Sequence, residues 1–220
     1  MSAISADLSH LGAHLESGAD VLGFPLSEEQ AARLVAYLVL LERWNRVYNL
    51  TAVREPERMV GLHILDSMTA LPYIRGTSVL DVGSGGGLPG LVLAILRPDL
   101  NVTVVDAVAK KMRFCQQVIS ELGLENASAV HSRVEQLNPC SLFETIISRA
   151  FSSISQFVSL ARTHLAKDGR LVAMKGQHPE HEILEAKLGD ARVDCYPVAV
   201  PGVDAERHIV TIGFAVSPNE

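Results

Sequence analysis

The sequence predicts an α/β fold in which a mostly parallel sheet follows a helical extension. Up to about residue 76, the apolar residues recur at helical spacing. From Ser78 onward, short runs rich in Val and Ile alternate with longer amphipathic segments. Strands that alternate with helices build a mostly parallel sheet with helices on both faces. We therefore expect a helical extension over residues 1–76 and an α/β domain over residues 77–220, joined as one structural unit.

The extension is predicted to contain two clear helices. The first begins near Ser27, which forms a capping box with Gln30, and its apolar side chains follow at helical spacing: Leu34, Tyr37, Leu38, Leu41 and Trp44. The second is expected to run from Pro56 to Tyr73. For residues 1–23 the pattern leaves open a weaker helix or a frayed segment.

Seven short apolar runs are predicted to be strands, namely 78–82, 101–105, 127–131, 145–148, 171–174, 193–200 and 207–214. Helices are expected over 88–96, 109–122 and 153–165. The last two strands flank Pro201-Gly202 and are expected to pair antiparallel, so the seven-stranded sheet ends in an antiparallel C-terminal strand. Ligands of such sheets bind at the carboxyl ends of the parallel strands, where the strand order reverses.

Composition narrows the class of protein. The chain has 220 residues, 48% of them hydrophobic and 20% charged, which is typical of an ordinary globular protein. The longest apolar runs are too short or too interrupted to span a bilayer, and residues 1–23 lack the features of a secretory signal. Three widely spaced cysteines (Cys115, Cys140 and Cys195) fit neither a zinc site nor a disulfide framework. We therefore expect a cytoplasmic protein without a metal or a membrane.

The formal net charge of −6 argues against a protein that coats nucleic acid through bulk charge. It leaves room for a local basic face around one active site.

A glycine-rich loop, Asp81-Val82-Gly83-Ser84-Gly85-Gly86-Gly87, follows the first predicted strand and opens a helix. Glycines there permit positive φ angles and a close approach of the backbone to a ligand. The loop has two other interpretations. Gly85, Gly87 and Gly90 also satisfy the dinucleotide pattern G-x-G-x-x-G, and the glycines alone suit a tight strand-to-helix turn.

Three features favour S-adenosylmethionine as the ligand. Asp81 is suited to order the loop and to attract a cationic ligand, whereas it would sit poorly beside a pyrophosphate. Asp106 ends the next strand, where a carboxylate accepts ribose hydroxyls, although it also suits a helix N-cap. The chain is too short for a separate dehydrogenase substrate domain. These features predict a Rossmann-like class I S-adenosylmethionine-dependent methyltransferase, with Asp81, Gly83, Gly85 and Asp106 as cofactor-binding residues.

Several further segments, spread from about residue 30 to the C-terminus, carry a more specific resemblance. They are Trp44 to Thr51, His63-Ile64-Leu65-Asp66-Ser67, Asp81 to Gly90, Ser132 to Glu135, Ser148-Arg149-Ala150-Phe151, Lys175-Gly176-Gln177 and Glu206-Arg207-His208. On these segments the chain resembles the bacterial small-subunit ribosomal RNA guanine-N7 methyltransferases, the RsmG or GidB family. Glu144 departs from the family, which often has Asp before the fourth strand.

This resemblance implies transfer of a methyl group to N7 of one guanine of 16S rRNA, guanine 527, in the small ribosomal subunit or an assembly intermediate. It also implies cofactor contacts at Gly83, Leu88, Val134, Glu135 and Arg149. A monomer is expected. Two alternatives stay open: methylation of a small molecule or a protein, which an apolar cleft would favour, and a non-catalytic RNA-binding assembly factor.

The chemistry of the acceptor atom predicts which residues matter. Guanine N7 has a free lone pair and no proton, so the reaction requires no general base. We expect Arg149 and Lys175 to act catalytically through positioning and electrostatics, because both follow strands at the expected cleft. The predicted RNA-binding residues are Arg133, Lys175, Arg207 and His208.

Several other polar and aromatic side chains are expected to serve the structure or to line the cleft. His63 and Asp66 are expected to pair with each other and brace the cofactor loop, or to line the substrate cleft. Trp44 and Tyr48 are expected to pack in the core rather than stack on bases. The three basic residues Lys110, Lys111 and Arg113 are interpreted as a solvated helix face, with an RNA-facing patch as the alternative.

Overall fold

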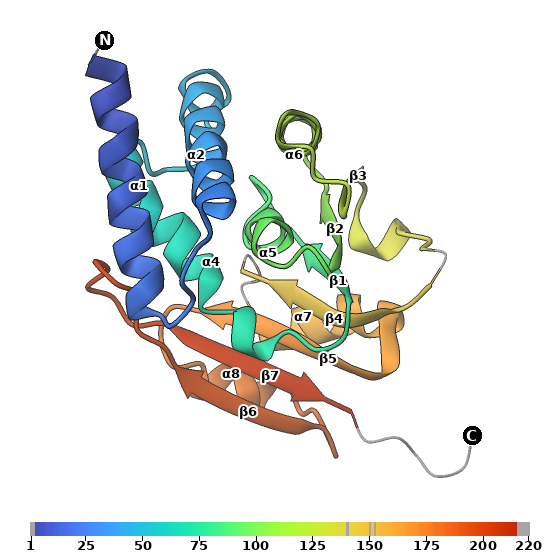
Figure 1. The fold of residues 1–220 in the computed structure, drawn as a ribbon. Helices are drawn as coiled ribbons and strands as arrows, with labels where there is room; N and C mark the ends of the chain where they lie inside the picture. Colours follow the sequence, from blue (N-terminus) through green and yellow to red (C-terminus); the bar gives the residue numbers. More distant parts are fainter. Residues whose placement is uncertain (1–2, 140, 150, 152, 215–220) are drawn as a thin grey trace.

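A computed structural model describes residues 3–139, 141–149, 151 and 153–214 (Figure 1). Its centre is a seven-stranded sheet in the order β3-β2-β1-β4-β5-β7-β6. The strands are β1 Ser78–Val82, β2 Asn101–Asp106, β3 Ala127–His131, β4 Phe143–Ser148, β5 Leu165–Lys175, β6 Arg192–Pro197 and β7 His208–Gly213. The predicted seven-stranded α/β sheet is confirmed. Cys140 and Ala150, which the sequence analysis named, lie outside the described residues.

The direction of the strands fixes where a ligand binds. Neighbouring strands from β3 to β5 run parallel, whereas β7 is antiparallel to both β5 and β6. The chain moves outward from β1 through β2 to β3 and then returns to the other side of β1 with β4. The strand order therefore reverses between β1 and β4, and the carboxyl ends of these strands flank the switch point.

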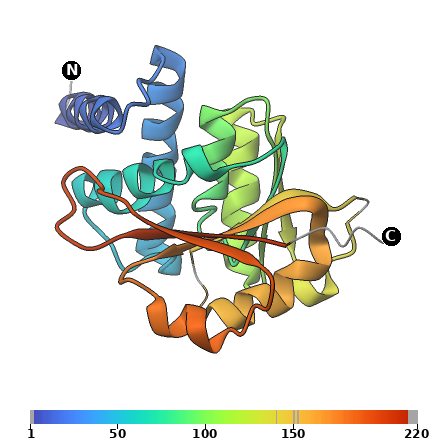
Figure 2. The ribbon, with the colours of Figure 1, turned by 90° about the horizontal axis from the view of Figure 1, so that it is seen from below.

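Helices cover both faces of the sheet (Figure 2). One face carries α2 (Glu28–Tyr48), α5 (Gly90–Leu96) and α6 (Ala109–Leu122), whose apolar residues share one core with α1 (Ala3–Val21). The other face carries α7 (Ile154–Ala161) and α8 (Glu180–Glu185) over a second core. Residues of the extension and of the sheet contribute to the same first core. The boundary near residue 76 stays a prediction.

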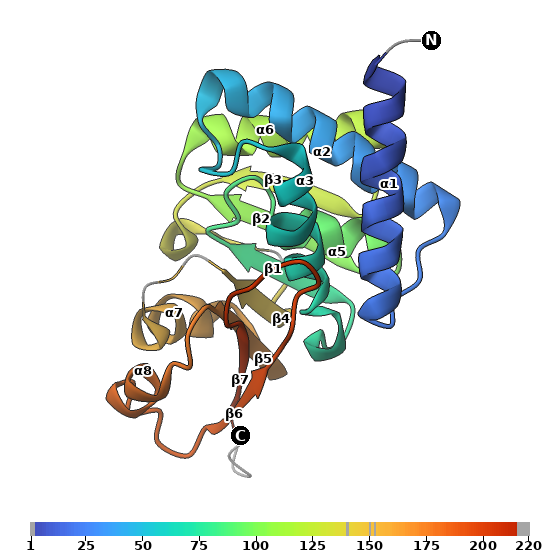
Figure 3. The same ribbon diagram turned by 90° about the vertical axis from the view of Figure 1, so that its left-hand side faces the viewer.

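The first helix forms and packs instead of fraying. Leu11, Leu15 and Ala19 are buried at spacings of four residues, so one face of α1 contributes to the core. Figure 3 shows α1 crossing α2 beside the segment that precedes β1. The predicted start of α2 is confirmed, because the Ser27 hydroxyl accepts from the Gln30 amide and the Gln30 side chain accepts from the Ser27 amide.

The segment predicted as one helix from Pro56 to Tyr73 is not regular. It consists of α3 (Pro56–Met59), a π-helical turn η1 (Val60–Leu65), α4 (Asp66–Met68) and a short 3₁₀ turn η2 (Leu71–Tyr73). A π turn bonds residues five apart and so accommodates one residue more than an α-turn. The apolar pattern had predicted helix correctly but did not reveal this change in pitch.

Three other expectations need correction. The helix after β4 ends at Ala161 and is followed by a 3₁₀ turn η4 (Arg162–His164), so β5 begins earlier than predicted. β6 ends at Pro197 rather than residue 200. The helix α8 was missed because it is short and none of its residues is buried, which leaves almost no apolar pattern. In the described part of the chain, no helix combines the length and apolarity needed to cross a bilayer.

Candidate cofactor and RNA site

The glycine loop leaves the carboxyl end of β1 at the switch point. The amides of Gly83 and Ser84 donate to the carbonyl of Val105, at 2.8 and 3.2 Å, which ties the start of the loop to β2. Gly85 adopts φ +60°, and a Cβ atom there would meet no atom within 4 Å. Gly85 is therefore needed for its left-handed backbone, and its open side faces the space above the loop.

Asp81 orders the loop from beneath. Its side chain is fully buried, and its Oδ2 atom accepts from the Gly90 amide at 2.8 Å. A Cβ atom on Gly90 would lie 2.9 Å from that oxygen and 2.6 Å from Val104 Cγ1, so only glycine fits there. Burial raises the pKa of Asp81 to about 7, against the lowering effects of the Gly90 hydrogen bond and of Arg149. Among the described residues, its Oδ1 atom has no hydrogen-bond partner.

Asp106 holds the outer edge of the loop. Its Oδ2 atom accepts from the Gly85 amide at 3.1 Å and pairs with Lys111 Nζ at 3.2 Å. Its Oδ1 atom accepts from the Val108 amide at 2.9 Å. The N-cap hypothesis for Asp106 is wrong, because the N-cap of α6 is Val108. Lys111 is more than a solvated charge, since it neutralises the carboxylate that fixes the loop.

Tyr37 of α2 fixes the loop from the side of the extension. Its buried hydroxyl donates to the carbonyl of Gly86 at 2.7 Å. Burial raises the pKa of this phenol well above its usual range, with smaller contributions from Cys115 and Asp81, so it remains a donor. The sequence pattern placed Tyr37 in the core but did not reveal this contact, because the partner lies 49 residues away.

Replacing Tyr37 with phenylalanine should loosen the loop while the fold is retained. The buried Gly86 carbonyl would lose its donor, which typically costs about 1–2 kcal/mol of stability. We expect a severalfold loss of S-adenosylmethionine affinity in calorimetry, together with a modest fall in melting temperature. Tyr196→Phe, at an exposed position on β6, is the matched control and should alter neither quantity. Unchanged cofactor affinity in Tyr37→Phe would show that the hydroxyl serves packing alone.

A cavity of about 170 Å³ borders the loop and brings several predicted residues together. Gly83, Gly85, Leu88 and Arg149, which are predicted to contact the cofactor, line it. Its other lining residues are Leu41, Leu50, Thr51, His63, Ser84, Gly86 and Lys111. Ser84 Oγ is buried and has no hydrogen-bond partner among the described residues.

A second cavity of about 380 Å³ lies beside the first, and Arg149 and His63 border both. Three further predicted residues line it: Lys175, Arg207 and His208. Lys175 donates to the carbonyl of Phe151 at 3.1 Å and pairs with Glu182 of α8 at 2.6 Å. His208 Nδ1 lies 3.1 Å from the carbonyl oxygen of Gly176. Residues from the ends of β4 and β5 and the start of β7 therefore meet at one edge of the sheet.

Five predicted residues line neither cavity. Two of them, Asp81 and Asp106, hold the loop instead. Arg133, Val134 and Glu135 lie at the short turn η3 (Val134–Gln136) after β3. Val134 is buried, and its carbonyl is hydrogen-bonded to His164 Nε2 at 2.8 Å. Arg133 and Glu135 are exposed. Their roles toward cofactor and RNA stay predictions that rest on the family resemblance.

His63 and Asp66 both line the second cavity but bond to different partners. His63 Nε2 is hydrogen-bonded to Thr51 Oγ1 at 2.9 Å, whereas Asp66 pairs with Arg149 and Arg207. Burial, with Arg149 second, lowers the pKa of His63 to about 4, so the imidazole is neutral at pH 7. The expectation that His63 and Asp66 pair with each other therefore gives way to the cleft-lining alternative.

Trp44 and Tyr48 differ in burial. Trp44 packs edge-on against Phe114, with ring centroids 5.7 Å apart, as expected for the core. Tyr48 stacks on Trp44 but is 43% exposed, so its ring is not a core group.

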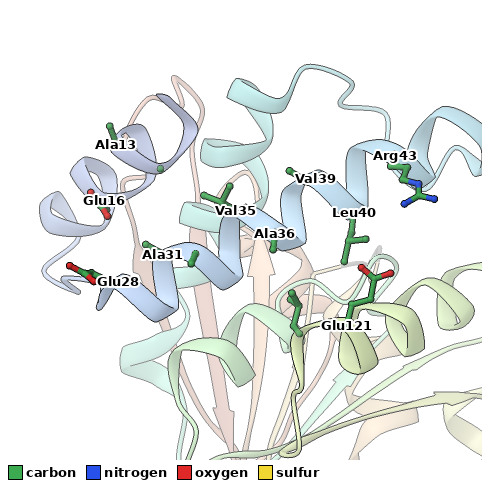
Figure 4. Close-up of a pocket in the computed structure, with 13 residues that line it drawn as sticks. Ala13, Glu16, Glu28, Ala31, Val35, Ala36, Val39, Leu40, Arg43 and Glu121 are labelled. Carbon is green, nitrogen blue, oxygen red and sulfur yellow. The ribbon is translucent and has the colours of Figure 1, made fainter. Parts of the chain in front are cut away.

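A larger groove of about 890 Å³ lies away from the loop, between α1, α2 and α6 (Figure 4). Small and apolar side chains such as Ala36, Val39 and Leu40 line most of it, and none of the predicted site residues does. No group of three or more His, Cys, Asp or Glu side chains within the described ranges is arranged to hold a metal ion.

The fold is that of the class I S-adenosylmethionine-dependent methyltransferases. The fold resembles a SAM-dependent methyltransferase from Aquifex aeolicus, with a TM-score of 0.56 and 19% identity over 76% of this chain and 97% of that one. It also resembles the glycopeptide N-methyltransferase MtfA, with a TM-score of 0.56 and 12% identity over 73% of this chain and 100% of that one.

The chain belongs to the GidB family, rRNA small subunit methyltransferase G, whose model matches residues 30–210. A ribosomal RNA small subunit methyltransferase G from Methylobacillus flagellatus is 53% identical over 89% of this chain and 95% of its own length. The protein of the same name from Chromobacterium violaceum is 50% identical over 90% of this chain and 95% of its own length. The resemblance inferred from the short segments is therefore confirmed.

Proposed function

We propose that this protein transfers a methyl group from S-adenosylmethionine to N7 of one guanine of 16S rRNA, guanine 527. The observation that carries the proposal is the pair of cavities that share Arg149 at the switch point of the sheet. One cavity borders the glycine loop, and the other is lined by Arg149, Lys175, Arg207 and His208. A cleft with this basic lining favours RNA over an apolar small molecule. The names of the relatives support the same substrate class.

The residues around the loop suit a cationic nucleoside cofactor. Gly85 leaves open space where a Cβ atom would otherwise project, and Ser84 Oγ and Asp81 Oδ1 lack partners among the described residues. The carboxylate of Asp81 beneath the loop would attract the ammonium group of S-adenosylmethionine through the low-dielectric interior. Asp106, which already accepts from the Gly85 amide, stands at the end of β2 where ribose hydroxyls are bound in such folds.

When bound, S-adenosylmethionine supplies an electrophilic methyl group on a sulfonium. The residues of this chain then have to align guanine N7 with that group, because N7 carries a lone pair and no proton. Arg149 borders both cavities and is placed to position the RNA against the cofactor. His63 stays neutral beside it and so adds no repulsion as positive charge develops on the purine. Lys175, which lines the second cavity, is held by Glu182 and the Phe151 carbonyl.

The test uses purified protein, tritiated S-adenosylmethionine and small ribosomal subunits from cells that lack the enzyme. We expect one methyl group per subunit, found by mass spectrometry of digested 16S rRNA as 7-methylguanosine at position 527. The acidic net charge predicts that assembled subunits or assembly intermediates are better substrates than naked rRNA.

We propose that the enzyme acts as a monomer in the cytoplasm.

This methylation assay and two further measurements separate the alternatives. Cofactor binding without methylation of any rRNA would redirect the search to a protein or small-molecule acceptor. An assembly factor without catalysis would retain its effect on subunit maturation when Gly83 is replaced, whereas an enzyme would lose it. Binding of NADH in place of S-adenosylmethionine would reject the methyltransferase chemistry.

A further inference from the structure

Asp66 holds two arginines that come from distant parts of the chain. Its Oδ2 atom pairs with Arg149 Nη1 at 3.1 Å, and its Oδ1 atom pairs with Arg207 Nε at 2.9 Å. Arg149 follows β4, whereas Arg207 immediately precedes β7. One carboxylate therefore fixes two guanidinium groups on the wall of the same cavity.

The geometry of these bonds leaves donors for a ligand. A guanidinium carries five N–H donors in one plane. Arg149 uses Nη1 for Asp66 and for the carbonyl of Leu62, at 3.2 Å, and Arg207 uses Nε for Asp66 and Nη1 for the carbonyl of Glu206, at 2.8 Å. Within the described part of the chain, neither Nη2 group has a partner. The Asp66 side chain is only 5% exposed, whereas Arg149 and Arg207 retain 28% and 23% exposure.

The charges around the cavity favour an anion. One carboxylate offsets only one of the two arginines, and Lys175 already has its own partner in Glu182. The pair of arginines therefore carries one surplus positive charge with unused planar donors. Arginine forks match phosphate oxygens in geometry and in charge. Among RNA groups, a phosphodiester fits this arrangement better than a neutral base edge.

We propose that Asp66 is a positioning residue that holds Arg149 and Arg207 side by side to clamp one phosphodiester of the RNA next to the target nucleotide. This inference rests on the proposed function and deepens it. Asp66 itself touches the two arginines and not the reacting atoms. Its effect on catalysis is therefore indirect, through the orientation of the two guanidinium groups.

Asp66→Asn gives a sharp test, because the change in net charge and the loss of the arginine positions have opposite effects on RNA affinity. Removal of a negative charge would, by bulk electrostatics alone, tighten the binding of RNA. Loss of the clamp geometry would weaken it. We expect the KM for small ribosomal subunits to rise at least tenfold, and the dissociation constant for S-adenosylmethionine, measured by calorimetry, to rise by a smaller factor because Arg149 also borders the cofactor cavity.

Asp99→Asn is the matched control. Asp99 forms two hydrogen bonds with the exposed Arg97, at 2.7 and 2.6 Å, in the turn before β2. This change also removes one negative charge and releases one arginine. Asp99, however, precedes the amino end of β2, whereas the residues of the two cavities follow carboxyl ends of strands or lie elsewhere in the sequence. Its KM for subunits should stay the same or fall slightly. An Asp66→Asn enzyme that behaves like Asp99→Asn would overturn the proposal.

A second variant keeps the proposal testable if Asp66→Asn folds poorly. Arg207→Lys preserves the charge but removes the planar fork, so we expect a similar rise in KM. The double variant Asp66→Asn/Arg207→Lys should be little worse than either single one, since both disrupt one clamp. Additive effects, or a loss of cofactor affinity as large as the rise in KM, would refute a shared phosphate clamp. Failure of the proposed function itself is visible separately, as absence of rRNA methylation by the unmodified protein.

Discussion

Gly85→Ala is expected to lower the affinity for S-adenosylmethionine at least tenfold and to reduce methyl transfer correspondingly at subsaturating cofactor. Gly85 lines the cavity beside the loop, and a Cβ atom there would project into space that no protein atom occupies within 4 Å. The added methyl group would therefore displace the cofactor rather than clash with the protein. Isothermal titration calorimetry gives the affinity, and thermal unfolding gives the cost to stability.

Gly123 offers an unusually close control for this change. It ends α6 with φ +61°, against +60° for Gly85, and a Cβ atom on either residue would meet nothing within 4 Å. The left-handed backbone should cost each alanine variant about 1 kcal/mol of stability. Both proteins should thus melt at similar temperatures, and only Gly85→Ala should lose cofactor affinity. Equal affinities in the two variants would place the cofactor elsewhere.

Asp81→Asn should make the protein more stable at pH 8 and yet impair cofactor binding at least a hundredfold. The buried carboxylate has a pKa of about 7, so above that pH the fold carries a desolvated charge. Asparagine retains an oxygen to accept from Gly90 and removes the charge. A pKa shift of this size corresponds to a gain of about 1–4 kcal/mol in the free energy of unfolding of Asp81→Asn. The cost of burying an amide without a hydrogen-bond partner reduces this gain. The cofactor would lose the carboxylate that attracts its ammonium group.

The pH dependence of this prediction follows from the direction of the shift. Because the pKa of Asp81 is raised in the folded state, its contribution to stability is fully present below about pH 4 and is lost as the pH rises through about 7. The advantage of Asp81→Asn should therefore be largest at pH 8 and small at pH 5. Asp99 and Glu144, whose pKa values are lowered, affect both proteins equally and cancel in the difference. Denaturant titrations at the two pH values provide the measurement, and a stability difference that does not vary with pH would contradict the assignment.

Much of the fold was predictable because strand and helix patterns are local. Val- and Ile-rich runs placed all seven strands, and the Ser27 capping box placed the start of α2. The pitch of the segment after Pro56 was not predictable, since a π turn and an α-helix bury apolar residues at similar spacings. The short exposed α8 lacks any apolar period, although it supplies Glu182 to the site.

The sequence predicted which residues form the candidate site better than it predicted the contacts between them. Arg149, Lys175, Arg207 and His208 do meet at one cavity, because each stands next to a strand end. The contact between Tyr37 and the glycine loop was hidden, since it joins the extension to the sheet across 49 residues. The shared carboxylate of Asp66 was hidden for the same reason: its partners lie 83 and 141 residues away.

The π turn at Val60–Leu65 bears on how this segment tolerates changes in length. Each residue of an α-helix advances the chain by 100° around the axis, given 3.6 residues per turn. Deletion of one residue within the turn would let the segment relax into a regular helix whose two ends keep nearly their present facing, because the π turn already accommodates one residue more than an α-turn. Insertion of a further residue would instead rotate Asp66 by about 100° relative to the residues before the turn, such as Met59, and the two would no longer face their present partners together. An insertion between Pro56 and Asp66 is therefore incompatible with the contacts that Asp66 makes with Arg149 and Arg207.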